Sequence, residues 1–342
     1  MLTNAIIAEL LALDAEAEEG HRERALRRAS RAALTWPEEA GAVIGQDRPL
    51  TELRAVGPWV ARRIHGWLEA PPDPPEPPVL RRGFITVAQA REVLADHPDV
   101  RLRADLQMHT TWSDGSASVR EMVDACAALG YEHVAITDHS KGLPIARGMD
   151  EGRVAAQAEE VARVNAELDV EGAPIRALHA IEMNLSPSGD GDMELDALAR
   201  LDLVLGAFHS RLRVTDDETD RYVRALRNPT VHVMAHPRGR KWNLREGLSA
   251  DWSRVADEAA AQHTALEIDG YPDRQDADLE LLAEIKRAGG YISIGTDAHA
   301  TWELAFWELG LALALLAEIP RERILNLMTA DELGRWVRER AT

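Results

Sequence analysis

The sequence predicts a two-domain α/β protein, in which a small all-helical domain precedes a closed or nearly closed barrel of parallel strands. Three observations lead to this prediction. A proline-rich stretch divides the chain, the part before it has only helical periodicity, and the part after it alternates seven β-rich apolar runs with helical segments. A chain of 342 residues that is 45% apolar and 28% charged is long enough for two compact domains.

Residues 1–70 are expected to form the all-helical domain. Apolar residues recur at helical spacing in the segments IIAELLAL, ALRRASRAAL and WVARRIHGWL, and no stretch alternates between apolar and polar residues. Residues 71–83 are expected to form a semi-rigid linker, because proline lacks an amide donor and fixes φ near the polyproline II value. The prolines of this linker are Pro71, Pro72, Pro74, Pro75, Pro77 and Pro78.

Residues 84–342 are expected to form the barrel. Its seven predicted strands lie in ADLQMHT, HVAITDHS, IRALHAIEMNL, LDLVLGAFHS, VHVMAHP, ALEIDG and YISIGTDAH. The segments between them, such as SVREMVDACAALG and DADLELLAEIKRAGG, have helical periodicity and end in glycine. Because the strand runs are apolar on both faces, we expect interior strands covered by helices, as in an α/β barrel.

Charge and composition exclude several classes of protein. The net charge of −19 disfavours broad binding of polyanions to a basic surface. A single cysteine, Cys126, excludes internal disulfides and thiolate-rich metal sites and is typical of a reducing compartment. The amino-terminal segment resembles neither a secretion signal nor a membrane span, so we expect a cytoplasmic protein without a membrane partner.

Histidines gather at the carboxyl ends of the predicted strands. Five of the twelve lie there: His109, His139, His209, His236 and His299. Four carboxylates follow the same rule: Asp114, Asp138, Glu182 and Asp297. Strand carboxyl ends converge on one rim of a barrel, so these residues predict a multinuclear site for Zn²⁺, Mn²⁺ or Fe. His133, His179, His232 and His263 are interpreted as caps or core residues.

These motifs also carry a family resemblance. DLQMHTTWSDG, AITDHS, HAIEMNL, GAFHSR, MAHPRGR and SIGTDAH resemble, in this order, the motifs of the PHP (polymerase and histidinol phosphatase) superfamily of metal-dependent phosphoesterases. The resemblance covers roughly residues 100–340 and implies a distorted (β/α)7 barrel with up to three metals at the strand carboxyl ends.

The resemblance implies a ligand set for each metal. One metal would be bound by His109, Glu182 and Asp297, and a second by Glu182, His209 and His236. A third would be bound by Asp114, His139 and His299. The family motif usually opens with His-x-His, whereas this chain has Gln107 at the first position. An amide oxygen is a weaker ligand than imidazole, so the first metal is expected to bind less tightly or to contact Gln107 through water.

The chemistry expected at such a site is hydrolysis of a phosphate ester. Two close cations lower the pKa of a bridging water and present it to phosphorus as hydroxide. Arg211 and Arg240 lie at the same rim and are candidates to bind the phosphate oxygens, or are part of a solvated loop. Asp297 and His299 are candidates to protonate the leaving oxygen.

The first domain has a resemblance of its own. LTELRAVGPWVARRI resembles a helix-hairpin-helix with a turn at Val56-Gly57, and residues 1–70 resemble the amino-terminal domain of DNA polymerase beta-like enzymes. Such turns bind DNA phosphates without reading sequence, and Arg62 and Arg63 would contribute charge. Ala55 replaces the usual first glycine. The arginines of HRERALRRASR would add a phosphate-binding face or form the solvated side of a helix.

Bacterial family X DNA polymerases contain both of these domains. This chain has only some thirty residues between the two parts, so the polymerase catalytic region is absent there and we expect no DNA polymerisation. Arg63 replaces the lysine of the family's lyase chemistry and the first domain has no lysine, so we expect no lyase activity. We expect a phosphoesterase acting at DNA or nucleotide 3′ ends, with weak, sequence-independent DNA binding. The alternatives are a phosphatase of histidinol-phosphatase type and a DNA-binding or scaffold protein with a degenerate site. The oligomeric state stays open.

Overall fold

The computed structural model describes residues 2–340, which divide into two compact units. The first unit extends to His97 and includes Lys241–Glu246, and the second contains the rest. The sequence-based boundary lay at residue 83, so residues 84–97 and 241–246 group with the helical unit instead of the barrel. The helix Val87–Ala95 belongs to the first unit and is attached to it by a hydrogen bond, in which Val87 N–H donates to the Leu34 carbonyl at 2.9 Å.

The first unit is all-helical, as the sequence predicts. Its helices are α1 (Asn4–Glu16), α2 (Gly20–Ala33), α3 (Ala40–Gly45), η1 (Leu50–Glu52), α4 (Pro58–Glu69), η2 (Val79–Arg81) and α5 (Val87–Ala95). Side-chain caps fix the starts of α1 and α5: Thr3 accepts from Ile6 N–H, and Thr86 forms a capping box with Gln89. The segment between α4 and η2, which holds the prolines, has no helix or strand.

Fully buried side chains from four helical segments and one loop form the core of this unit: Ile7, Leu11, Leu26, Trp36, Val43 and Ile64. Trp242 packs in the same core, which explains why Lys241–Glu246 belongs to this unit. Arg81 is buried and donates to Glu9 and to Asn243, both at 2.8 Å. The segment far away in sequence is therefore held by apolar packing and by hydrogen bonds.

The second unit is a nearly closed barrel of seven parallel strands in sequential order, which confirms the predicted fold class. The strands are β1 (Ala104–Asp105), β2 (His133–Ile136), β3 (Arg176–Asn184), β4 (Leu203–Ala207), β5 (Val233–Met234), β6 (Ala265–Asp269) and β7 (Tyr291–Gly295). Each strand pairs in parallel with the next. A bridge between Met108 and Ala298 joins the segments that follow the first and last strands.

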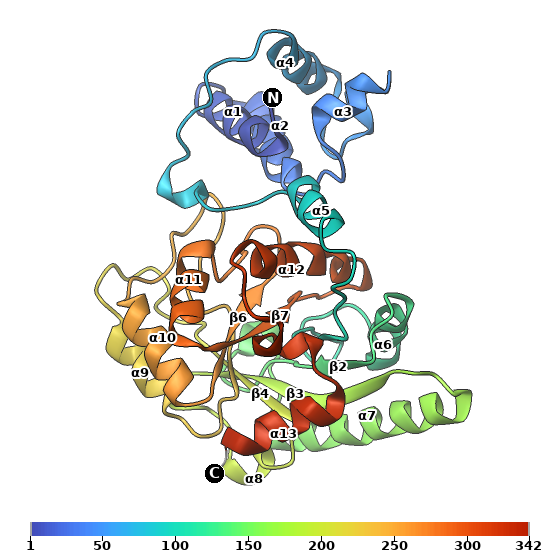
Figure 1. Cartoon of the computed structure of the whole chain (residues 1–342), viewed down its shortest axis with the longest axis vertical. Coiled ribbons are helices and arrows are strands. Elements are labelled where there is room, and N and C mark those ends of the chain that lie inside the picture. Colours follow the sequence, from blue (N-terminus) through green and yellow to red (C-terminus); the bar gives the residue numbers. More distant parts are fainter. Residues whose placement is uncertain (1, 341–342) are drawn as a thin grey trace. The chain divides into compact units, whose positions relative to one another are not determined.

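Helices surround these strands (Figure 1). They are α6 (Val119–Ala128), η3 (Pro144–Ala146), α7 (Glu151–Glu171), α8 (Leu195–Leu198), α9 (Thr219–Leu226), α10 (Trp252–Ala261), α11 (Leu279–Ala288), η4 (Thr301–Phe306), α12 (Trp307–Leu316), η5 (Arg321–Arg323), η6 (Leu325–Leu327) and α13 (Ala330–Arg340). Gly172 and Gly289 end α7 and α11 in the left-handed conformation. None of the helices in the described residues is long and apolar enough to cross a membrane.

The strands are buried almost throughout, in agreement with their continuous apolar runs. Strand residues such as Leu178, Leu205 and Val233 form one apolar cluster, to which α13 contributes Leu333 and Trp336. Because all seven strands run in the same direction, their carboxyl ends lie at one end of the barrel. Residues that directly follow different strands are therefore neighbours in space.

Candidate metal centre

The five strand-end histidines lie together in the structure. His109 and His139 follow β1 and β2, and their ring centroids are 4.3 Å apart. His299, after β7, lies 4.4 Å from His109, and His209, after β4, lies 5.2 Å from His139. His236, after β5, lies 5.6 Å from His209. The rings therefore form one continuous cluster at the carboxyl ends of the strands.

Glu182, in β3, is the centre of this cluster. Its carboxylate is completely buried and lies close to four imidazole nitrogens. The nitrogen-to-oxygen distances are 2.7 Å for His236 Nε2, 3.0 Å for His139 Nδ1, 3.1 Å for His209 Nε2 and 3.4 Å for His109 Nε2. Several imidazole nitrogens around one buried carboxylate are a set of side chains that suits a divalent cation.

Two more carboxylates complete the cluster. Asp297 Oδ1 lies 2.9 Å from His109 Nε2. Asp114 Oδ1 lies 3.4 Å from His299 Nε2 and 3.6 Å from His139 Nε2. Asp297 and His236 have positive φ angles of 50° and 29°, which are strained for residues other than glycine and recur at functional sites.

Three groups of these side chains have the spacing of a metal site. They are His109-Glu182-Asp297, His139-Glu182-His209 and His109-Asp114-His139-His299. The first group is the set predicted for the first metal. The second contains His139 where the sequence analysis used His236, although His236 also lies 2.7 Å from Glu182. The third contains all three residues of the predicted third site and adds His109.

Unpaired polar atoms in the cluster fit divalent metals. His109 Nδ1 is buried without a hydrogen-bond partner, and the buried His139 Nδ1 and Glu182 Oε2 atoms lie 3.0 Å apart without the geometry of a hydrogen bond. Burying such atoms without a partner costs about 1–3 kcal/mol each, and a cation would compensate this cost. Imidazole and carboxylate together are the ligands that Zn²⁺, Mn²⁺ and Fe accept.

The charges of the cluster favour cations too. Burial opposes the ionisation of Glu182, but His139 and His209 hold its pKa well below the ordinary value. Burial likewise opposes ionisation of Asp114, whose pKa the neighbouring histidines lower to about 2. Against the effect of burial, the hydrogen bond to Asp114 and the charge of Asp297 raise the pKa of His299 to about 10. The carboxylates are therefore ionised at neutral pH.

Gln107, which the sequence predicts as a ligand, has a carboxylate as its neighbour. Its amide lies 2.6 and 2.7 Å from the two oxygens of Glu267, a contact that requires the amide nitrogen to face the carboxylate. Both residues are completely buried. Burial and the charge of Asp269 raise the pKa of Glu267 well above its ordinary value. Gln107 thus pairs with an acid from β6.

Asp138 also has a different role from a ligand. Its buried carboxylate accepts from Thr110 N–H at 2.8 Å, Ser113 N–H at 3.0 Å and Gln157 Nε2 at 2.6 Å. The hydroxyls of Thr110 and Ser113 donate to it as well. Asp138 therefore fixes the turn between His109 and Asp114, two of the clustered side chains.

Other supporting residues were not found by sequence analysis. Asn184 Oδ1 lies 3.2 Å from His209 Nδ1, and Glu303 accepts from His299 N–H at 2.7 Å. Asn184 is two residues after Glu182 on β3, so strand alternation could have indicated it. Glu303 lies in η4, and no periodicity connects it to the site.

The two predicted rim arginines have different surroundings. Arg240 is 4% exposed and donates to Asp278 and to the Arg274 carbonyl, so it faces protein instead of the open rim. Arg211, with 54% of its side chain exposed, lies 3.6 Å from Glu218. Arg274, which the sequence analysis did not consider, lies 3.2 Å from Asp297 Oδ2.

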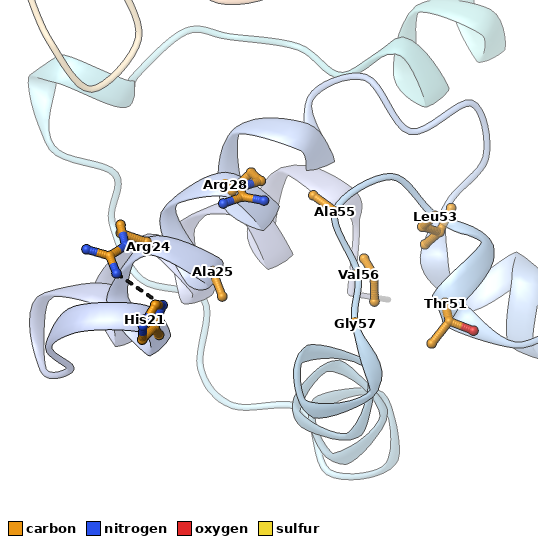
Figure 2. Close-up of a pocket in the computed structure, with 9 residues that line it drawn as sticks. All are labelled: His21, Arg24, Ala25, Arg28, Thr51, Leu53, Ala55, Val56 and Gly57. Atoms are coloured by element: carbon orange, nitrogen blue, oxygen red, sulfur yellow. Dashed lines mark hydrogen bonds between the residues drawn. The ribbon is translucent and has the colours of Figure 1, made fainter.

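A second candidate site lies in the helical unit. His21, Arg24 and Arg28 on α2 and the turn Ala55–Gly57 line a pocket of about 410 Å³, whose residues are drawn in Figure 2. Arg24 and Arg28 are exposed. Ala55 adopts a φ of 63°, the left-handed conformation that glycine would favour. The pocket thus combines positive side chains with a tight turn before the amino terminus of α4.

Two of the arginines expected to bind DNA differ in their surroundings. Arg63 forms ion pairs with Asp14 and Glu18 and lies 5.3 Å from the Trp59 ring, so its charge is largely compensated. Arg62 is exposed and has no ion pair in the described residues. Val56 and Gly57 line the pocket.

Comparisons with known proteins agree with this geometry. The model of the PHP domain family matches residues 105–294. The DNA polymerase/3′-5′ exonuclease PolX of Bacillus subtilis is 34% identical over 239 residues, which are 70% of this chain and 41% of the relative. This chain therefore spans about two fifths of the length of that relative.

Probable phosphatases are similar as well. One from Tolumonas auensis is 30% identical over 44% of this chain and 62% of its own length. Another from Syntrophotalea carbinolica is 28% identical over 69% of this chain and 97% of its own length. Among solved structures, histidinol phosphate phosphatase from Lactococcus lactis covers 64% of this chain and 94% of its own, with a TM-score of 0.43 and 18% identity.

Proposed function

The chain belongs to the PHP domain family, and from this premise we propose that its metal centre hydrolyses phosphate esters at the 3′ ends of DNA or nucleotides. The family makes it a metal-dependent phosphoesterase, as the sequence analysis predicted. The observation that carries the proposal is the shell of four imidazole nitrogens around the buried Glu182 carboxylate. Imidazole and carboxylate side chains grouped at this spacing are the ligands that divalent cations take in proteins.

We assign two or three divalent ions, Zn²⁺, Mn²⁺ or Fe, to this cluster. One would be bound by His109, Glu182 and Asp297, and another by Glu182 and His209 with His139 or His236. A third would be bound by Asp114, His139 and His299. Gln107 is left out because it pairs with Glu267. When bound, such ions lower the pKa of water and stabilise negative charge on phosphate oxygens.

Residues of the chain then orient the ligands and handle a proton. Asp138 fixes the turn that carries His109 and Asp114, and Asn184 orients the His209 ring. The leaving oxygen must take up a proton when its bond to phosphorus breaks. Asp297 lies in contact with His109 and Arg274, whereas 31% of the His299 side chain is exposed, so His299 is the more accessible of the two candidates. It could donate a proton only while its Nε2 atom is not bound to the third ion.

A DNA substrate is favoured by the first unit. The pocket between α2 and the Ala55–Gly57 turn offers Arg24 and Arg28 to a phosphate without a preference for any base. The similarity to an exonuclease-containing protein over 70% of this chain supports the same substrate class. With a net charge of −19, binding should be weak and lost at moderate salt.

The test is hydrolysis of single-stranded DNA labelled at its 5′ end, with Mn²⁺ present, by the full chain. We expect products shortened stepwise from the 3′ end. The double variant Arg24→Gln/Arg28→Gln should weaken DNA binding about tenfold and leave hydrolysis of p-nitrophenyl phosphate unchanged. Arg27→Gln is the matched control, because Arg27 lies on the same helix but pairs with Glu23 at 2.8 Å.

A small phosphomonoester is the second candidate substrate. It is favoured by the probable phosphatase of Syntrophotalea carbinolica, which this chain matches over 97% of that protein's length. If the full chain releases phosphate from small monoesters but leaves labelled DNA intact, the DNA proposal is wrong and this alternative replaces it.

A further inference from the structure

Arg274 brings a guanidinium group to the edge of the metal cluster. It lies in the loop between β6 and α11, at the carboxyl end of the barrel. Its Nη2 atom is 3.2 Å from Asp297 Oδ2, and its Nε atom is 3.6 Å from Asp269 Oδ2. Two buried acids from neighbouring strand ends therefore hold this cation.

The two oxygens of Asp297 have different neighbours. Oδ1 lies 2.9 Å from His109 Nε2, inside the group of side chains suited to a metal. Oδ2 lies on the Arg274 guanidinium. Arg274 thus contacts the carboxylate of one metal-ligand candidate directly. One phosphate group could therefore contact both the guanidinium and a metal ion bound by Asp297.

The backbone around Arg274 is fixed. Its N–H donates to the Tyr271 carbonyl at 2.8 Å, and its own carbonyl accepts from Arg240 Nε at 2.9 Å. Asp269, which holds the guanidinium, in turn accepts from Tyr271 N–H at 2.7 Å. A side chain anchored in this way loses little further freedom when it binds a ligand.

The Arg274 side chain is only partly buried. The side chain is 27% exposed, whereas the Asp297 and Asp269 side chains that hold it are 4% and 0% exposed. Guanidinium has five N–H donors, and the two ion pairs involve Nη2 and Nε. Apart from these two ion pairs, the guanidinium forms no hydrogen bond or ion pair with another residue in the described part of the chain.

We propose that Arg274 binds the phosphoryl group of the substrate at the metal centre. A planar fork of N–H donors matches two phosphate oxygens, and the charge adds to that of the metals. Arg240, one of the two arginines that the sequence offers as candidates for phosphate binding, is a positioning residue that holds the Arg274 backbone. The proposal rests on the phosphoesterase function but not on DNA as the substrate.

The experiment compares the full-length, metal-loaded protein with its Arg274→Gln variant. Calorimetry measures the dissociation constant of inorganic phosphate, and mass spectrometry measures the metal content. We expect the phosphate dissociation constant to rise roughly 10- to 100-fold with unchanged metal content. The KM for p-nitrophenyl phosphate should rise by a similar factor.

A second variant, Arg274→Lys, keeps the charge but removes the fork. It should bind phosphate with an intermediate constant, and it decides the question if the glutamine variant does not fold. The matched control is Arg227→Gln, because Arg227 also pairs with a carboxylate, Glu258, but lies between α9 and β5 at the opposite end of the barrel. This control should bind phosphate like the wild type.

The opposite result would overturn the proposal. If the Arg274 variants lose metal but the remaining loaded protein binds phosphate normally, Arg274 only positions Asp297. The DNA proposal fails if labelled DNA stays intact. The Arg274 proposal fails if its variants bind phosphate like the wild type, and this measurement needs no turnover, so the two failures are distinguishable.

Discussion

Asp138→Asn should damage the metal centre although Asp138 lies in none of the groups suited to bind a metal. The wild-type carboxylate accepts from two backbone N–H groups, two hydroxyls and the Gln157 amide. These bonds define the turn from His109 to Asp114. The variant keeps the shape of the side chain but removes its charge and one acceptor oxygen.

The magnitude follows from these bonds. Hydrogen bonds to a charged group contribute about 1.5–3 kcal/mol and neutral ones about 0.5–1.5 kcal/mol. Gln157 can turn its amide, because its Oε1 is buried without a partner and would accept from the new amide. With that relief, we expect a loss of about 2–4 kcal/mol in the free energy of unfolding. Displacement of the turn should weaken metal binding about 10- to 100-fold.

Urea unfolding of the metal-free protein measures the first effect, and calorimetric titration with Mn²⁺ measures the second. The control is Asp124→Asn, since Asp124 is 53% exposed and pairs with Arg120, whose side chain is 31% exposed. We expect this control to change stability by less than about 1 kcal/mol. An Asp138→Asn protein with wild-type stability and metal affinity would refute the role of this network.

Three further predictions concern the surroundings of the site. In Gly295→Ala the new Cβ would lie 2.6 Å from Gln107 Cβ and also collide with Glu267, so urea unfolding should show a loss of about 1–3 kcal/mol. Burial lowers the pKa of His133 to about 4, and the unfolded chain binds its proton below 6.5. The wild type should therefore lose up to about 3 kcal/mol of stability as pH falls from 6.5 to 4, and His133→Phe should lack this part of the loss in urea unfolding at several pH values. Asn184→Ala should weaken Zn²⁺ or Mn²⁺ binding about tenfold in calorimetry, because His209 loses the partner of its Nδ1; equal affinity would show that Asn184 does not orient the ring.

The barrel could be predicted from the sequence because the signals for it are local. Each strand is a short apolar run between helical segments, and parallel strands place their carboxyl ends at one end of the barrel. The order of the elements along the chain is therefore enough to predict that His109, His139 and Glu182 are neighbours. No knowledge of side-chain packing is needed for that prediction.

The rest depends on side-chain direction and on contacts between distant segments. Gln107 occupies a motif position, but its partner Glu267 lies 160 residues later, on another strand. Arg274 and Arg240 are both arginines in loops at the same rim, and only the packing shows that the first is partly exposed and the second buried. Trp242 joins the helical core through a contact that no periodicity indicates.

The central claim is tested most directly by counting the metal ions bound to each chain in native mass spectrometry. After incubation with Mn²⁺ or Zn²⁺, the wild-type protein should carry two or three ions per chain. Glu182→Gln should carry fewer, because Glu182 belongs to two of the three groups suited to a metal. A wild-type protein that binds no metal under these conditions would contradict the account.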